Sequence, residues 1–282
     1  MTATVERVEA PAPARPRPVR RPGLLARPAA LWGRRRAVRL LVTRDLKVRY
    51  ASSALGYLWS VLEPLLLAGI YWFVFTQVFT RTVGGEPYIV FLLAGLLPWT
   101  WFNGAVTEAA RALHTEAKLV RSTNVPREVW VVRVVLSKGV EFLLSLPVLF
   151  GFALACGAPM DWHLVLLVPG AVLMAVLVLG VGLLLAPMVV LVRDLERVVR
   201  IALRLGFYAT PVIFTVSDVP GRLSAVFALN PLAGVIELNR AGFSPEPVQW
   251  SLVGISAVAA VVLLTAGWAV FARLERTVLK EI

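Results

Sequence analysis

Apolar residues are concentrated in six long stretches, which are separated by short segments rich in arginine, lysine, glycine or proline. The stretches cover residues 58–80, 88–110, 129–156, 164–192, 198–216 and 249–271. About 20 helical residues cross a hydrocarbon core of about 30 Å. The pattern therefore predicts an all-α membrane protein with six transmembrane helices. The fifth stretch is the weakest, because Arg200 and Arg204 lie near one end of it.

The basic residues predict the orientation of these spans. Of the 29 Lys and Arg residues, 26 fall before residue 58, at 111–138, at 193–204 or after residue 271. These four groups occupy alternate gaps between the spans, as expected for cytoplasmic segments. Both chain ends are therefore expected in the cytoplasm. Arginine far outnumbers lysine, which we interpret as GC-rich coding and hence a bacterial plasma (inner) membrane protein.

The ends of the chain differ from the spans. Residues 1–30 alternate proline and arginine without the apolar run of a signal peptide, which predicts a disordered basic cytoplasmic tail. In residues 31–57, apolar positions at helical spacing lie opposite a basic face, as in an amphipathic helix in the membrane interface. Residues 58–272 form the expected six-span domain, and 273–282 a short cytoplasmic tail.

The segment between the fifth and sixth spans contains two short helical patterns. They cover Arg222–Leu229 and Leu232–Phe243, and Asn230-Pro231 separates them. Each is too short to span a bilayer, so we expect short re-entrant helices on the outer side.

Composition excludes several classes of function. With 58% hydrophobic and 16% charged residues, the chain is far more apolar than a soluble domain. The net charge of +12 lies beside apolar spans, which favours anionic membrane lipids over nucleic acid as a partner. No G-x-x-x-x-G-K-[ST] phosphate loop occurs, and His114 and His163 fall on opposite sides of the predicted membrane. We therefore expect no catalytic residues, no metal and no cofactor in this chain.

Several short motifs occur in a recognisable order. They are TRDLKVRY at 43–50, LGYLW at 55–59, Glu63-Pro64, NVPRE at 124–128, Arg193-Asp194, TPVIF at 210–214 and ALNPL at 228–232. Together they resemble the ABC-2 type permeases that export polysaccharides. Phe214 stands where that family usually has tyrosine.

The resemblance implies a function and partners. It implies a homodimer of this chain with two copies of a separate ATP-binding cassette subunit, which would bind ATP and Mg. The implied cargo is a lipid-linked glycan of O-antigen, capsule, teichoic acid or cell-wall galactan type. One alternative is an ABC-2 exporter of drugs or small lipids. A second is an integral-membrane glycan-modifying enzyme, which would need clustered carboxylates or histidines that the sequence lacks.

The cytoplasmic segments supply two sets of candidate residues. The polar segment 111–128 is expected to contact the ATPase subunit rather than to be a solvated loop, through Glu116, Lys118, Arg121, Asn124 and Arg127. In the interface helix, Arg44, Lys47 and Arg49 are candidates for binding the lipid phosphate, because cationic donors suit phosphate oxygens. Simple anchoring to anionic lipid is the alternative for those three residues.

The membrane segments supply the remaining candidates. Tyr71, Trp72, Trp99, Trp101 and Phe102 are expected to line a translocation path, with helix packing or an interfacial aromatic belt as the alternative.

An outer gate is predicted at the breaks of the 217–248 segment and just before it, against the alternative of a simple loop. Its residues are Pro211, Pro220, Asn230 and Pro231.

Ionisable residues inside the predicted spans need partners. Lys138 and Glu141 are expected to pair with each other at i and i+3. Glu108 lies near the inner end of its span, where it is expected either to snorkel to the interface or to pair with Arg111 at the same spacing.

Overall fold

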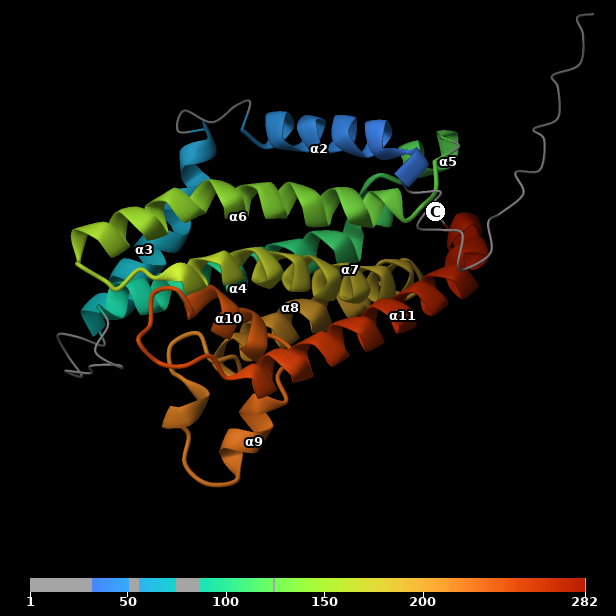
Figure 1. Cartoon of the computed structure of the whole chain (residues 1–282). Helices are drawn as coiled ribbons and strands as arrows, with labels where there is room; N and C mark the ends of the chain where they lie inside the picture. The colour runs from blue at the N-terminus through green and yellow to red at the C-terminus, as the bar shows by residue number, and fades with distance from the viewer. Residues whose placement is uncertain (1–31, 51–55, 75–86, 124, 282) are drawn as a thin grey trace, which may run out of the picture.

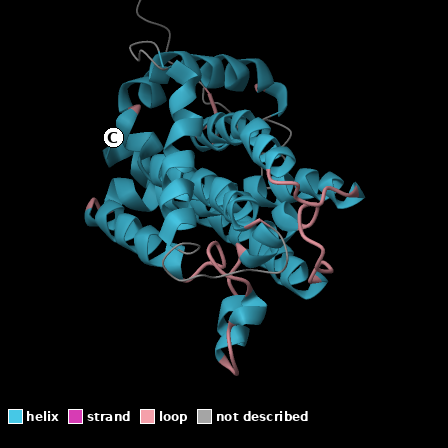
Figure 2. Ribbon diagram, turned by 90° about the vertical axis from the view of Figure 1, so that its left-hand side faces the viewer, coloured by secondary structure: helices cyan, strands magenta, loops and turns pink. Residues whose placement is uncertain are grey.

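The computed structural model describes residues 32–50, 56–74, 87–123 and 125–281, and these residues form helices and loops without a strand (Figure 2). The predicted all-α class is therefore confirmed for this part of the chain. The α-helices are α2 (Arg35–Tyr50), α3 (Trp59–Phe73), α4 (Tyr88–Thr115), α5 (Ala117–Ser122), α6 (Val129–Ala155), α7 (Leu167–Leu191), α8 (Asp194–Tyr208), α9 (Leu223–Ala228), α10 (Ala233–Arg240) and α11 (Trp250–Glu281).

Four of the described helices are long and apolar enough to cross a membrane. They are α4, α6, α11 and α7 with the 3-10 turn Trp162–Leu166 that precedes it. The other two predicted spans stay predictions. Residues 75–80 of the first one lie outside the described residues, α3 has 15 residues, and α8 also has 15. At 1.5 Å per residue α8 is about 22 Å long, less than the roughly 30 Å of a hydrocarbon core.

Helix α8 also ends earlier than the apolar stretch that predicted it. The stretch continues to residue 216, whereas the helix stops at Tyr208 and the chain turns through Thr210 and Pro211. Proline lacks a backbone N–H, and it disfavours helical geometry at the residue before it. Apolar composition here reflects burial of a turn rather than continuation of a helix, since Val212 is fully buried.

Helix α4 is the central element of the bundle. In its most apolar part 78% of the residues are buried, against 33% or less in the other three long helices. It packs against α3, α6, α7, α8 and α10. Because α4 is enclosed by protein, its polar groups face other helices or an internal cavity rather than lipid.

Helices α7 and α11 form the closest helix pair, on the side of the bundle away from α2 (Figure 1). A Cβ atom added at Gly267 would lie 2.2 Å from the backbone oxygen of Gly180. Small residues at a helix crossing let two backbones approach closely, which drives association where lipid removes the hydrophobic effect. The two glycines therefore set the spacing of this pair.

The segment after α8 contains the two short helices that the sequence predicts. Helix α10 is buried against α11, α7 and α4, whereas α9 projects away from the bundle (Figure 1). Helix α11 does not end at the membrane boundary expected near residue 271 but continues to Glu281. Residues 273–281, expected as a tail, are thus an extension of the last helix.

Candidate functional site

A cavity of about 760 Å³ opens between α3, α4, α6 and α8. Polar and aromatic side chains share its wall. The lining residues are Glu63, Leu67, Tyr71, Leu96, Trp99, Thr100, Trp101, Asn103, Gly104, Thr107, Lys138, Glu141, Phe142, Ser145, Arg200, Leu203, Arg204, Phe207 and Tyr208. A cavity of this size falls in the range of small-molecule sites, and its mixed lining can hold a ligand with both hydroxyl groups and apolar faces.

Aromatic rings form one wall of this cavity. The ring of Phe207 stacks on Tyr71 with centroids 5.8 Å apart and meets Trp99 edge-on at 5.5 Å. Trp101 stacks on Phe142 at 5.0 Å, and its indole N–H donates to the backbone oxygen of Val135. The rings thus hold one another in fixed orientations and present their remaining faces to the cavity.

Of the five aromatic residues expected on the translocation path, three line this cavity and two do not. Tyr71, Trp99 and Trp101 contribute to the lining, with both tryptophans largely buried. Phe102 packs beside Trp99 at a centroid distance of 5.9 Å without lining the cavity. Trp72 does not line the cavity, and 41% of its surface is exposed. Whether any of them contacts a cargo stays a prediction.

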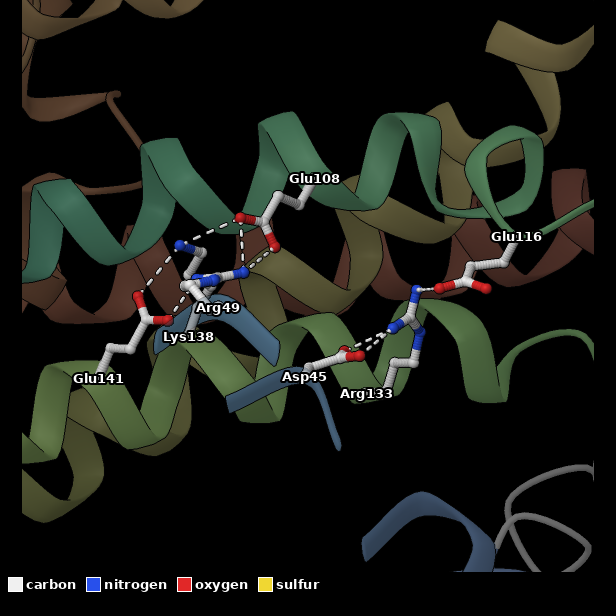
Figure 3. A network of polar contacts seen from close by, with 7 residues as sticks. All are labelled: Asp45, Arg49, Glu108, Glu116, Arg133, Lys138 and Glu141. Carbon is white, nitrogen blue, oxygen red and sulfur yellow. Dashed lines mark hydrogen bonds and ion pairs between the residues drawn. The ribbon is translucent and has the colours of Figure 1, made fainter. Parts of the chain in front are cut away.

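Two residues that line the cavity, Lys138 and Glu141, form an ionic cluster with Arg49 and Glu108 (Figure 3). Lys138 Nζ lies 3.0 Å from Glu141 and 3.1 Å from Glu108, and the Arg49 guanidinium lies 2.6 Å from Glu108. Arg49 also donates to Glu141. The predicted Lys138–Glu141 pair is confirmed. Glu108 pairs with Arg49 and Lys138 rather than with Arg111, the partner expected for it.

A second set of ion pairs lies one to two turns away along the same helices (Figure 3). Arg133 on α6 is 7% exposed and donates to both carboxylate oxygens of Asp45 on α2, one of them at 2.6 Å. Glu116, just before α5, accepts from Arg44 at 2.7 Å and approaches Arg133 at 3.5 Å. Burial raises the pKa of Asp45, and the positive charges of Arg133 and Arg44 oppose that rise.

These ion pairs fix α2 on the bundle. The pairs formed by α2 reach α4, α6 and Glu116, and they join residues 59 to 92 apart in sequence. A buried charge left without its partner costs about 3–5 kcal/mol, and loss of Asp45 would leave the Arg133 guanidinium only the longer contact with Glu116 at 3.5 Å. The motif residues Arg44, Asp45 and Arg49 therefore have a structural role that follows directly from their contacts.

The three cations expected to bind lipid phosphate differ in their surroundings. Arg44 and Arg49 are held by carboxylates, whereas Lys47 is exposed. Phosphate binding by Arg44 or Arg49 would require each to exchange a protein carboxylate for the ligand. The assignment of these residues to a lipid phosphate stays a prediction.

The residues expected at the ATPase contact lie on and beside the short helix α5. Lys118 and Arg121 are exposed, while Arg127 donates to the backbone oxygen of Val125 at 2.8 Å. Asn124 lies outside the described residues. Glu116 is committed to ion pairs within the chain, as described above. The exposed face of α5 thus carries positive charge at one end of the bundle.

The predicted gate residues lie around the turn after α8 and the junction of α9 and α10. Asn230 links the two regions, because its side-chain amide donates to the backbone oxygen of Ala209 at 2.8 Å and to Thr210 Oγ1 at 3.0 Å. Pro211 is buried, Pro231 is half-buried and Pro220 is exposed in the loop before α9. The gating role of these residues stays a prediction.

Arg240 on α10 is a structural centre that the sequence analysis did not single out. Its guanidinium donates to the backbone oxygens of Pro211 at 2.9 Å and Phe214 at 3.3 Å, and to that of Val212. It also lies 3.6 Å above the ring of Phe91. Gly95 makes room for it, since a Cβ there would lie 2.6 Å from the guanidinium. A basic residue in an otherwise apolar segment was the available signal.

The helices and the cavity indicate a class of protein. Long apolar helices indicate a multi-pass membrane protein, and its helices enclose a cavity with a polar and aromatic lining. Among the described residues no group of His, Cys, Asp and Glu could hold a metal ion.

Comparison with known proteins identifies the family. A family model described as ABC-2 type transporter matches residues 36–243, and the chain belongs to that family. It is 33% identical over 240 residues to the O-antigen export system permease protein RfbA of Klebsiella pneumoniae, covering 84% of this chain and 91% of the relative. It is 35% identical over 236 residues to the protein of that name from Myxococcus xanthus (82% and 89% covered).

A more distant relative has a related cargo in its name. The polysialic acid transport protein KpsM of Escherichia coli is 25% identical over 252 residues, covering 86% of this chain and 95% of the relative. The resemblance inferred from the motifs is thus confirmed at the level of the family. These relatives are transport permeases, in agreement with the expectation that this chain is not itself an enzyme.

Proposed function

We propose that this chain is the membrane-spanning subunit of an ATP-driven exporter that moves a lipid-linked polysaccharide out of the cytoplasm. The observation that carries the proposal is the aromatic and polar cavity between α3, α4, α6 and α8. It occurs in a chain 33–35% identical to O-antigen export permeases over most of its length. The cargo class comes from those relatives, and the cavity supplies the chemistry that such a cargo needs.

Sugars suit the wall of this cavity. Aromatic faces bind the C–H surfaces of sugar rings without fixing a hydroxyl pattern, which permits a polymer to slide past them. Trp99 and Tyr71 supply such faces, and Asn103 and Thr107 on α4 supply hydrogen-bonding groups beside them. The Thr107 hydroxyl already donates to the backbone oxygen of Asn103, but a small apolar drug would leave the Asn103 amide without a partner, at a cost that disfavours the drug-exporter alternative.

The partner subunit supplies the energy in this proposal. Two copies of an ATP-binding cassette subunit would bind ATP and Mg and dock at the cytoplasmic end of a homodimer of this chain. The exposed residues Lys118 and Arg121 on α5, with Asn124 and Arg127 nearby, are proposed as the docking surface. Charges on an exposed short helix set the register and association rate of such a contact.

The proposed orientation places both chain ends in the cytoplasm and the α9–α10 segment outside. The basic and apolar exposed residues of α2, among them Arg39, Leu40 and Val48, support contact of this helix with anionic lipid at the inner surface. The cations Arg44, Lys47 and Arg49 are proposed as phosphate contacts, and the Asn230–Pro231 region as an outer gate.

The experiment that tests the function is depletion of this chain in its bacterium, followed by tracking of lipid-linked glycan on each side of the plasma membrane. We expect full-length polymer to accumulate inside the cell. Absent or truncated polymer would instead indicate a synthesis enzyme and contradict the proposal. Unchanged export would contradict it as well, provided that immunoblotting shows the chain to be gone.

A further inference from the structure

The cations that face the cavity fall into two groups. Lys138 is saturated, because the carboxylates of Glu108 and Glu141 both lie about 3 Å from its ammonium group. Arg204 forms no hydrogen bond or ion pair with any residue in the described part of the chain, and Arg200 reaches only Glu196, at 3.9 Å. Both arginines are exposed to the cavity side of α8. Their guanidinium groups are thus available to an external anion.

These two arginines belong to a row along one face of α8. The row consists of Arg193, Arg197, Arg200 and Arg204. Successive members are four, three and four residues apart, so all four fall within about 60° around the helix. Val199, Leu203 and Phe207 lie on the adjoining face, centred about 90° from the arginine row, and their burial in the bundle fixes the rotation of α8. That rotation directs Arg200 and Arg204 to the cavity wall.

We propose that Arg200 and Arg204 bind a phosphate or diphosphate group at the mouth of the cavity. This inference rests on the proposed function and specifies which residues bind the charged part of its cargo. Two guanidinium groups one turn apart offer paired N–H donors that match phosphate oxygens. The ring of Tyr208 also lines the cavity, so a sugar linked to the phosphate would meet the aromatic wall.

The other charged residues that line the cavity determine whether a substitution strengthens or weakens anion binding. Two carboxylates line it, Glu63 and Glu141. Glu141 is neutralised by Lys138 and Arg49, whereas Glu63 on α3 forms no ion pair within the described residues. Among the described residues, the lining therefore carries the unpaired positive charge of Arg204, that of Arg200 with a long contact to Glu196 at 3.9 Å, and the unpaired negative charge of Glu63. An anion is attracted overall, and removal of the Glu63 charge strengthens that attraction.

The test measures binding to the purified full-length chain in nanodiscs of uncharged lipid. Two probes separate the possible sources of the phosphate: undecaprenyl diphosphate in the bilayer and inorganic diphosphate in solution. We expect each of Arg200→Gln and Arg204→Gln to weaken binding about tenfold and the double variant about a hundredfold. We expect Glu63→Gln to strengthen binding about threefold. The matched control is Arg276→Gln, which removes an exposed cation of α11 outside the cavity.

Arginine-to-lysine variants distinguish binding from damage to the fold. Lysine keeps the charge but loses the paired donors, so Arg200→Lys and Arg204→Lys should retain part of the affinity that glutamine removes. A variant that merely misfolds would not be rescued by charge. Monodispersity on size-exclusion chromatography checks each preparation.

Three outcomes would overturn the site: undiminished affinity of the double glutamine variant, loss of affinity only in Lys47→Gln, or no binding of either probe by the unmodified chain. Binding of the lipid probe alone would support the site and show that the polyprenyl chain contributes. The glycan-tracking experiment is independent of this result. Arginine-dependent binding in a chain whose depletion leaves export unchanged would retain the site and contradict the proposed function.

Discussion

At the scale of single residues, buried charge in this protein is stabilised by specific partners rather than by solvent. Arg240 is 6% exposed, and backbone oxygens of the turn after α8 are among its acceptors. Helix ends and turns leave carbonyl groups without partners, and a guanidinium can satisfy several of them at once. The residue therefore ties α10, the 211–214 turn and α4 together from one position.

Replacement of Arg240 by methionine tests this role. The variant fills similar space but leaves the carbonyls of Pro211 and Phe214 without their donor, which should lower the free energy of unfolding by about 3 kcal/mol. Hydrogen exchange should become faster at residues 209–216, and the apparent melting temperature in detergent should fall. Arg222→Met, at an exposed arginine beside α9, is the control. Equal exchange in the two variants would contradict the role given to Arg240.

At the scale of helices, small residues determine which helices approach closely. The α7–α11 crossing depends on Gly180 and Gly267, whereas α2 is held to α6 by ion pairs instead. Glycine packing and ion pairing each suit the surroundings of the helices that they hold together. Apolar helices in lipid gain from tight backbone contact, and a helix rich in charge gains from carboxylate partners.

A pair of valine substitutions on α11 tests the crossing. Gly267→Val places a side chain where even a Cβ would lie 2.2 Å from the Gly180 oxygen, so the helices must separate. We expect a fall in the yield of folded protein and in the apparent melting temperature. Gly254→Val is the matched control, because a Cβ at Gly254 has no neighbour within 4 Å. If both variants were equally stable, close packing of α7 on α11 would not be required.

At the scale of the whole molecule, charged residues serve two separate kinds of contact, one within the bundle and one on its surface. The ion pairs of α2, α4 and α6 are internal, whereas the cations of α5 point outward at one end. A subunit that docks there would sense movement of α4, since α5 directly follows it and Glu116 joins both to α2. The proposed ATPase contact thus begins at Lys118, two residues after Glu116, whose ion pairs hold α2 to the bundle.

Charge reversal on α5 tests this contact. The double variant Lys118→Glu, Arg121→Glu should lose its ATP-binding subunit during co-purification, with an affinity loss of about a hundredfold or more. Its own amount in the membrane should stay unchanged, because both side chains are exposed. The variant Arg273→Glu, Arg276→Glu reverses the same number of exposed charges on α11 and serves as control. Retention of the ATP-binding subunit by the α5 variant would place the contact elsewhere.

The candidate site could be predicted from the sequence only in part. The Lys138–Glu141 pair was visible, because two residues three apart on a helix are neighbours whatever the fold. The aromatic residues Trp99 and Trp101 were visible as unusual mid-span positions. Arg204, Phe207 and Tyr208 were not linked to them, because only packing of α8 against α4 brings these residues to one cavity.

The sequence by itself determined the membrane class, the all-helical fold and the family, since hydropathy and motif order are properties of the chain read locally and added along its length. Only the tertiary structure decided which charged side chains bind other residues of the chain and which face the cavity. Arg49 meets Glu141 across 92 residues and Arg240 meets Pro211 across 29, whereas Arg204 faces a cavity. No periodicity encodes such contacts, because they depend on how the helices pack in three dimensions.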